Sequence, residues 1–143
     1  MENTRFTRDL SANADRVWAL LDDFPRLDWL LLEHELEVVG DGSPGTVRII
    51  KMPGAESVWE VLLSKDLASR SLSYAVPVGL QAPVSKYSAT MRLEPLDEGS
   101  TRLHWHSTWL PDTGRDPAEI SAEFSRIYGA LADGIETVLQ SGS

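Results

Sequence analysis

The sequence contains no cysteine, which excludes disulfide bonds, thiolate-bound zinc and thiol nucleophiles. It also lacks any run of Lys or Arg: 13 basic residues stand against 22 acidic ones, and the formal net charge is -9. Such a protein repels polyanions, so nucleic acids and anionic membrane surfaces are poor partners. No stretch approaches the ~18 apolar residues of a membrane span, and residues 1–5 lack the apolar segment of a signal peptide. We therefore expect a cytoplasmic protein that does not insert into membranes.

The remaining composition is that of an ordinary folded chain. Hydrophobic residues make up 42% and charged residues 24% of the 143 residues, unlike the polar composition of disordered chains. A domain of this size buries roughly 68–70% of the surface that its unfolded chain exposes, which is enough for one core. No linker, repeat or low-complexity tract interrupts the sequence. We expect a single domain spanning residues 1–143, and composition leaves open whether it is a monomer or a homodimer.

The clearest local pattern lies near the C-terminus. Asp116 precedes Pro117, and Glu119 follows three residues after Asp116, which is the pattern of a helix N-cap with a capping box. Gly129 and Gly134 interrupt the segment at a cost of about 1 kcal/mol each, which predicts either close approach to another backbone or a kink. One long amphipathic helix is predicted, because apolar residues recur at steps of three and four: Ile120, Phe124, Ile127, Leu131, Ile135 and Val138.

The rest of the chain alternates short apolar runs with turn residues. Residues 5–10 are typical of a strand, Asn13 can cap a helix that ends near Pro25, and a second short helical turn is predicted over residues 27–32. Six extended runs follow, separated by Gly, Pro and Asp clusters that are typical of antiparallel hairpins. They cover residues 35–39, 46–52, 57–64, 71–76, 86–96 and 101–110. The long helix must then cover one face of the sheet, and a ligand pocket can form between them.

Four segments resemble a known family. They are Ser11–Phe24, Val58–Leu62, Pro83–Thr90 and Gly99–Trp105, and they occur in family order over nearly the whole chain. Together with the helix that follows Asp116, they resemble the START-like (SRPBCC) superfamily and, within it, the polyketide cyclase/dehydrase and lipid-transport family. The resemblance implies an α+β helix-grip fold. In this fold a curved antiparallel sheet of about seven strands wraps around the long C-terminal helix, with two short helices after the first strand.

The resemblance implies several functions, since fold does not fix function. Our leading hypothesis is a protein that binds or carries a hydrophobic small molecule, such as a lipid, a polyketide or an aromatic metabolite, without a cofactor. One alternative is a polyketide-type cyclase or dehydratase, in which His104 is the general acid/base and Tyr87 orients a carbonyl group. A second alternative is a ligand-gated interaction module, which would need the loops at residues 52–56 and 77–83 to move around the ligand.

The last predicted strand contains two histidines. His104 and His106 lie two residues apart and so share one face, but no third ligand stands in a recognisable motif, and we expect no metal site. Periodicity alone would turn Leu103, Trp105 and Trp109 inward and leave both histidines outside. The resemblance implies the opposite, because relatives carry a cavity carboxylate at the position of His104. We favour the inward orientation, which would make His104 a polar anchor that titrates near neutrality.

Other residues are candidates for the ligand cavity. Glu60 stands in an otherwise apolar strand, where it is either an exposed residue or a cavity carboxylate that needs a hydrogen-bonding partner. Tyr74 and Tyr87 correspond to positions that often line the pocket in relatives. The helix face that repeats every four residues from Phe124 would either roof the cavity or pack on the sheet. The full predicted ligand site is Glu60, Tyr74, Tyr87, Ala89, His104, Phe124, Tyr128 and Ala132.

Overall fold

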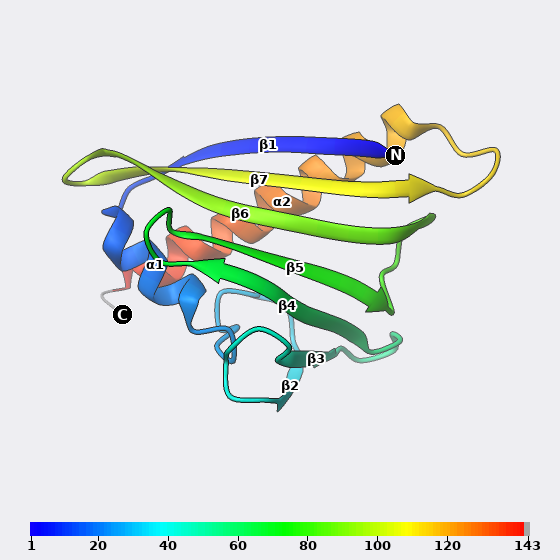
Figure 1. The fold of residues 1–143 in the computed structure, drawn as a ribbon, viewed down its shortest axis with the longest axis horizontal. Helices are drawn as coiled ribbons and strands as arrows, with labels where there is room; N and C mark the ends of the chain where they lie inside the picture. Colours follow the sequence, from blue (N-terminus) through cyan, green and yellow to red (C-terminus); the bar gives the residue numbers. More distant parts are fainter. Residues whose placement is uncertain (142–143) are drawn as a thin grey trace.

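The computed structural model describes residues 1–141 and contains one antiparallel sheet and two helices (Figure 1). The strands are β1 (Glu2–Leu10), β2 (Glu35–Val39), β3 (Val47–Lys51), β4 (Val58–Asp66), β5 (Ser71–Val78), β6 (Val84–Asp97) and β7 (Ser100–Pro111). The helices are α1 (Ala14–Asp22) and α2 (Pro117–Gln140). The sheet order is β1-β7-β6-β5-β4-β3-β2, so consecutive hairpins run from β2 to β7 and β1 pairs with β7.

Helix α2 crosses one face of the curved sheet, and α1 lies at the end of the sheet near the C-terminal end of α2 (Figure 1). The side of the sheet formed by β1 is tied directly to α2: Arg8 pairs with Asp133 at 2.6 Å, and the hydroxyl groups of Thr4 and Ser121 hydrogen-bond at 2.9 Å. This arrangement confirms the predicted α+β helix-grip fold.

The capping residues of both helices act as the sequence predicts. The Asn13 side chain accepts a hydrogen bond from the Arg16 backbone N–H at 2.9 Å, at the start of α1. The Asp116 side chain accepts one from the Ala118 backbone N–H at 3.0 Å, and Pro117 occupies the first turn of α2. Each cap satisfies a backbone donor that the helix itself leaves unpaired.

The predicted second helix after β1 is wrong. The Leu30 backbone N–H bonds to the Leu27 carbonyl at 3.1 Å, which closes a single turn that does not continue as a helix. Leu27 and Trp29 are buried in the core, whereas Leu31 and Leu32 are 60% and 64% exposed. Residues 27, 30 and 31 have helical spacing, but their burial does not follow it, because Leu27 is buried and Leu31 is exposed.

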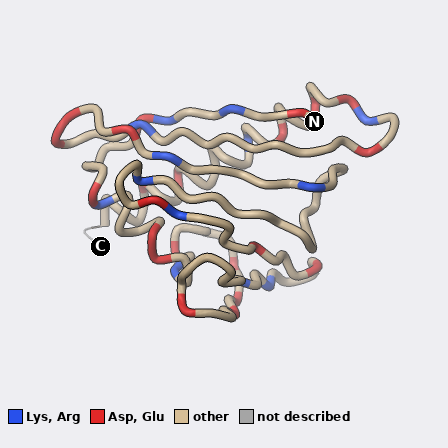
Figure 2. The backbone as a smooth tube through the Cα atoms, in the orientation of Figure 1, with Lys and Arg blue, Asp and Glu red and all other residues tan. Residues whose placement is uncertain are grey.

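The charged residues are spread over the molecule. Figure 2 shows Lys and Arg interspersed with Asp and Glu along the backbone. Several exposed basic side chains form ion pairs, among them Arg102 with Asp9 at 2.8 Å and Arg70 with Asp15 at 2.7 Å. Among residues 1–141, no helix is long and apolar enough to cross a membrane.

Gly134 allows α2 to approach the loop between α1 and β2. A Cβ atom added at Gly134 would lie 2.0 Å from the Trp29 carbonyl oxygen, a distance that no side chain can adopt. A Cβ atom added at Gly129 would meet the Phe6 ring at 3.8 Å, which is ordinary van der Waals contact. Close approach, one of the two explanations that the sequence offered, therefore accounts for Gly134.

We predict opposite effects of alanine at these two glycines. Gly134→Ala should lower the free energy of unfolding by about 1–3 kcal/mol, because the loop at Trp29 must move away from α2. Gly129→Ala should leave it unchanged or raise it by up to about 1 kcal/mol, because alanine is the better helix former. Urea denaturation followed by circular dichroism measures both. Equal changes in the free energy of unfolding of the two variants would contradict the close contact between Gly134 and the Trp29 carbonyl.

Candidate functional site

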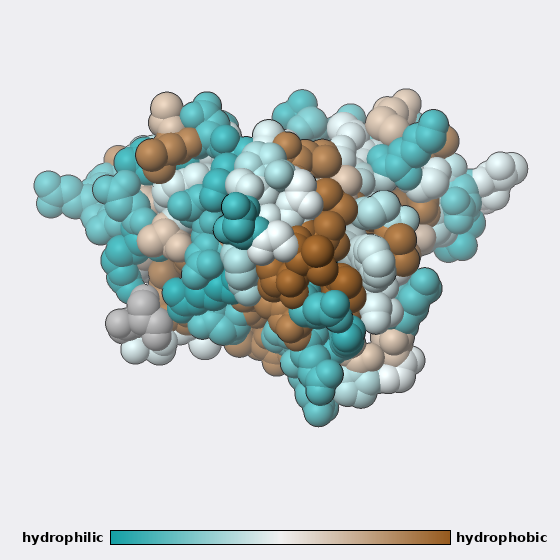
Figure 3. Space-filling view, turned by 60° about the horizontal axis from the view of Figure 1, so that its bottom comes forward, coloured by the Kyte–Doolittle hydropathy of each residue, from teal (hydrophilic) through white to brown (hydrophobic). Residues whose placement is uncertain are grey.

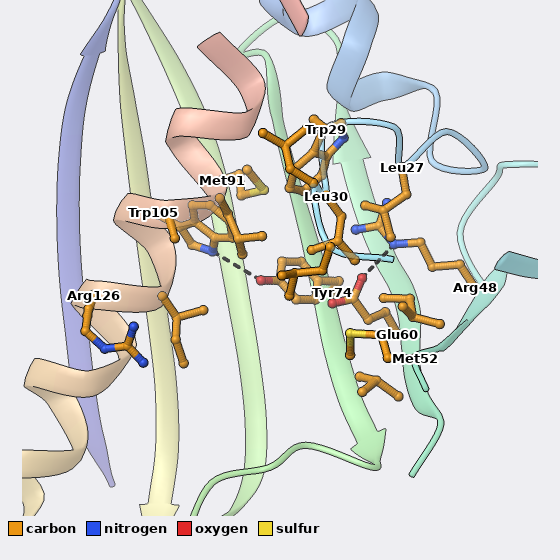
Figure 4. Close-up of a pocket in the computed structure, with 17 residues that line it drawn as sticks. Leu27, Trp29, Leu30, Arg48, Met52, Glu60, Tyr74, Met91, Trp105 and Arg126 are labelled. Atoms are coloured by element: carbon orange, nitrogen blue, oxygen red, sulfur yellow. Dashed lines mark hydrogen bonds and ion pairs between the residues drawn. The ribbon is translucent and has the colours of Figure 1, made fainter. Parts of the chain in front are cut away.

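A cavity of about 540 Å³ lies between α2, the loop after α1 and the inner face of the sheet (Figure 4). Its lining comes from the loop at residues 27 and 29–32, from inward side chains of β3 to β7, and from α2 at residues 126, 127, 130 and 131. Most of these side chains are apolar; the exceptions include Arg48, Glu60 and Tyr74. A largely apolar lining with a few polar groups, in a volume of about 300–1,000 Å³, is typical of a small-molecule site.

The polar end of the cavity is a buried ion pair. Arg48 on β3 and Glu60 on β4 are direct cross-strand partners, and Arg48 Nε donates to Glu60 Oε1 at 2.6 Å. Their side chains are only 6% and 16% exposed. Arg48 Nη1 also donates to the Phe24 carbonyl at 3.1 Å, and the guanidinium lies 4.1 Å from the centroid of the Phe24 ring. The carboxylate, the carbonyl and the ring together compensate the loss of water around the arginine.

Tyr74 joins the wall of the cavity to the core. Its hydroxyl accepts a hydrogen bond from Trp105 Nε1 at 3.1 Å, and Figure 4 shows the Glu60 carboxylate on the other side of the tyrosine ring. Burial, and secondarily the negative charge of Glu60, raise the pKa of the Tyr74 phenol above its ordinary value. Tyr74 therefore stays a neutral phenol at physiological pH.

The interior beside the cavity is filled by aromatic side chains. The hydroxyl groups of Tyr87 and Tyr128 hydrogen-bond to each other, and Tyr128 donates to Ser107 Oγ at 2.8 Å. The Trp105 ring stacks on Tyr128 with centroids 4.5 Å apart, and the Phe124 ring lies 5.2 Å from Tyr87. These contacts close the part of the interior that the cavity does not reach.

A family model described as polyketide cyclase / dehydrase and lipid transport matches residues 1–140. The chain belongs to this family. Its START-like fold is known for ligand binding. No curated protein matches the chain.

Several solved structures share this fold. Norcoclaurine synthase from Thalictrum flavum, in complex with dopamine and hydroxybenzaldehyde, is 20% identical with a TM-score of 0.77, covering 99% of this chain and 88% of that one. A protein from Nitrosospira multiformis is 18% identical with a TM-score of 0.78, covering 95% and 94%. XoxI from Bacillus cereus is also 18% identical with a TM-score of 0.78, covering 96% and 95%. At these identities the likeness shows the fold alone.

In this member of the polyketide cyclase / dehydrase and lipid transport family, two of the predicted ligand residues, Glu60 and Tyr74, line the cavity. Helix α2 instead presents Ile127, Ala130 and Leu131 to the cavity. The predicted face of α2 packs against the aromatic side chains of β6 and β7. The five other predicted residues, apart from His104, are buried in the core outside the lining of this cavity: Tyr87, Ala89, Phe124, Tyr128 and Ala132.

The prediction that His104 points into the interior is wrong. His104 lies on the outer face of β7, where its Nε2 hydrogen-bonds with Glu94 Oε1 at 2.8 Å and both side chains are partly exposed. Trp105 and Trp109 are 2% and 0% exposed and face inward. Burying two indole rings removes far more apolar surface from water than burying two imidazoles, so the periodicity of the strand decides the orientation. His104 therefore cannot act as an acid, a base or an anchor inside the cavity.

The sequence contained signals for residues that our prediction missed. Arg48 shares a face of β3 with Ile50, and this face lines the cavity, while Glu60 stands opposite Arg48 in the next strand. An arginine and a glutamate on the inner faces of adjacent strands indicate an ion pair. Among residues 1–141, no group of three or more His, Asp or Glu side chains is arranged to hold a metal ion.

The tyrosines give a direct test of how tightly the interior is packed. All three of them, Tyr74, Tyr87 and Tyr128, are buried, and burial raises the pKa of each phenol above 10.0. A raised pKa in the folded state contributes stability that is present below about pH 10 and is lost as the pH rises further. We expect no phenolate absorbance at about pH 10 while circular dichroism stays native, and its appearance together with unfolding at higher pH. Half-titration near the ordinary pKa in a folded protein would contradict this packing.

Proposed function

We propose that this protein binds and carries an apolar small molecule, such as a lipid, a polyketide or an aromatic metabolite, in the cavity beneath α2. The observation that supports it most strongly is the cavity of about 540 Å³ with its largely apolar lining. Carriage rather than catalysis is favoured because His104, the predicted general acid/base, lies on the outer face of the sheet. Glu60 is tied to Arg48, and Tyr74 is held as a neutral phenol.

The rim of the cavity supports passage of an apolar ligand. Leu31 and Leu32 are exposed to solvent and also line the cavity. Figure 3 shows a band of hydrophobic residues across one face of the molecule, with hydrophilic residues on both sides of it. Exposed apolar patches of this kind mark ligand or partner sites. An apolar molecule would therefore leave water gradually as it enters.

A second hollow lies on the outer face of the sheet. It is lined in part by Val39, Val47, Ile49 and Trp59. Because Val39 and Trp59 are 56% and 40% exposed, a ligand there would stay in contact with water. The inner cavity buries more of a ligand and is the better site.

One of the two loops that a ligand-gated module would move, at residues 77–83, packs against the residue that follows the other loop. A Cβ atom added at Gly79 would lie 2.0 Å from the carbonyl oxygen of Ser57. Met52, at the start of the first loop, lines the cavity. Movement of residues 52–56 and 77–83 around a ligand stays a prediction.

Filling the cavity should weaken ligand binding. Prodan is a neutral, apolar fluorophore without a hydrogen-bond donor, and its emission shifts to shorter wavelength in an apolar site. We expect native protein to bind it, and Ile127→Trp to weaken binding by more than about tenfold, because the indole takes up ligand volume. The matched control is Ala122→Trp, an exposed position on the same helix that does not line the cavity. Unchanged affinity in folded Ile127→Trp would rule out this site.

A further inference from the structure

The two residues of the buried ion pair, Arg48 and Glu60, differ in how many of their polar groups have a partner in the protein. Arg48 has the Glu60 carboxylate, the Phe24 carbonyl and the Phe24 ring around its guanidinium. Glu60 accepts from Arg48 through Oε1, whereas its Oε2 has no hydrogen-bond donor among residues 1–141. Because Glu60 lines the cavity, its second carboxylate oxygen is open to whatever fills that space. Figure 4 shows this carboxylate beside the aromatic ring of Tyr74, among the side chains that line the cavity.

An apolar ligand changes the surroundings of this oxygen. In the empty cavity, water can donate to Glu60 Oε2. A ligand that expels the water without replacing its hydrogen bond leaves a charged acceptor unpaired in an apolar site, which is strongly unfavourable. A donor on the ligand removes this penalty, and a hydrogen bond to a charged acceptor is among the stronger ones.

The charges of the lining select against ionised ligands. Arg48 and Glu60 neutralise each other, and Arg126 at the rim pairs with Glu123. A carboxylate on the ligand would face the free oxygen of Glu60 and find its cationic partner already occupied. An ammonium group would add an uncompensated positive charge to a site of low dielectric constant. A neutral donor is the group that fits.

We propose that the ligand is an apolar molecule that carries a neutral hydrogen-bond donor, an alcohol or phenol hydroxyl group, which donates to Oε2 of Glu60. This inference rests on the proposed function, since it requires that a ligand occupies the cavity. It assigns Glu60 as the residue that determines which ligands bind, with Arg48 holding the carboxylate in place.

Three ligands of equal chain length test the inference on native protein. They are n-decanol, decyl methyl ether and decanoate, each titrated against bound prodan at neutral pH. We expect n-decanol to compete at least about tenfold more strongly than decyl methyl ether, which can only accept hydrogen bonds. Decanoate should be the weakest competitor. Equal competition by the alcohol and the ether, or tightest binding of decanoate, would overturn the inference.

Variants of the ion pair test whether the preference for n-decanol depends on Glu60. Glu60→Gln removes the negative charge and leaves Arg48 available, so the affinity for decanoate relative to n-decanol should rise by about tenfold or more. The double variant Arg48→Met with Glu60→Leu removes both charges without leaving one unpaired, and it should lose the preference for n-decanol over the ether. A folded double variant that keeps this preference would contradict the role of Glu60.

A matched control uses a similar ion pair outside the cavity. Glu37 on β2 pairs with Lys51 on β3 at 2.9 Å, and both side chains are exposed. Glu37→Gln should leave all three affinities unchanged. Failure of prodan to bind native protein would count against the proposed function itself, whereas prodan binding without discrimination between alcohol and ether would count against the donor specificity alone.

Discussion

A single long helix is too narrow to cover the inner face of a seven-stranded sheet, and the rest of the structure depends on this constraint. Helix α2 is tied to β1 by the Arg8–Asp133 and Thr4–Ser121 contacts, and aromatic side chains of β6 and β7 fill the space beneath it. The strands β3 and β4 lie at the other side of the sheet. There the loop after α1 supplies the cover, held against α2 by the close contact at Gly134. The cavity is the space that the helix and this loop leave between them.

Under the proposed function, the buried ion pair has a clearer role in ligand recognition than in stability. A buried salt bridge contributes little compared with apolar side chains of the same shape, because both ions lose their water. Both partners lie where a ligand in the cavity would meet them, and one carboxylate oxygen has no hydrogen-bond donor among residues 1–141. Under the proposed function, the pair provides a neutral polar point at one end of an apolar space. Such a group would orient a neutral ligand and would disfavour a charged one.

Much of the fold followed from the sequence because local chemistry determined it. Asn13 and Asp116 begin their helices as predicted, and turn residues separate strands that pair in a meander. The site was harder to predict. For β7, the alternation of Trp105 with His104 gave the right orientation, and the analogy with relatives gave the wrong one. For α2, the apolar stripe is wider than one face, so periodicity could not decide whether Phe124 or Ile127 would meet the cavity. That depends on where the helix lies across the sheet.

A crystal structure of the protein with a bromine-labelled long-chain alcohol would test the proposed site most directly, because the anomalous signal of bromine locates the ligand without ambiguity. We expect a bromine peak within the cavity between the sheet and α2, near Ile127 and Leu131, with the hydroxyl group at Glu60. A peak confined to the hollow on the outer face of the sheet beside Trp59, with only water in the inner cavity, would contradict the proposed site.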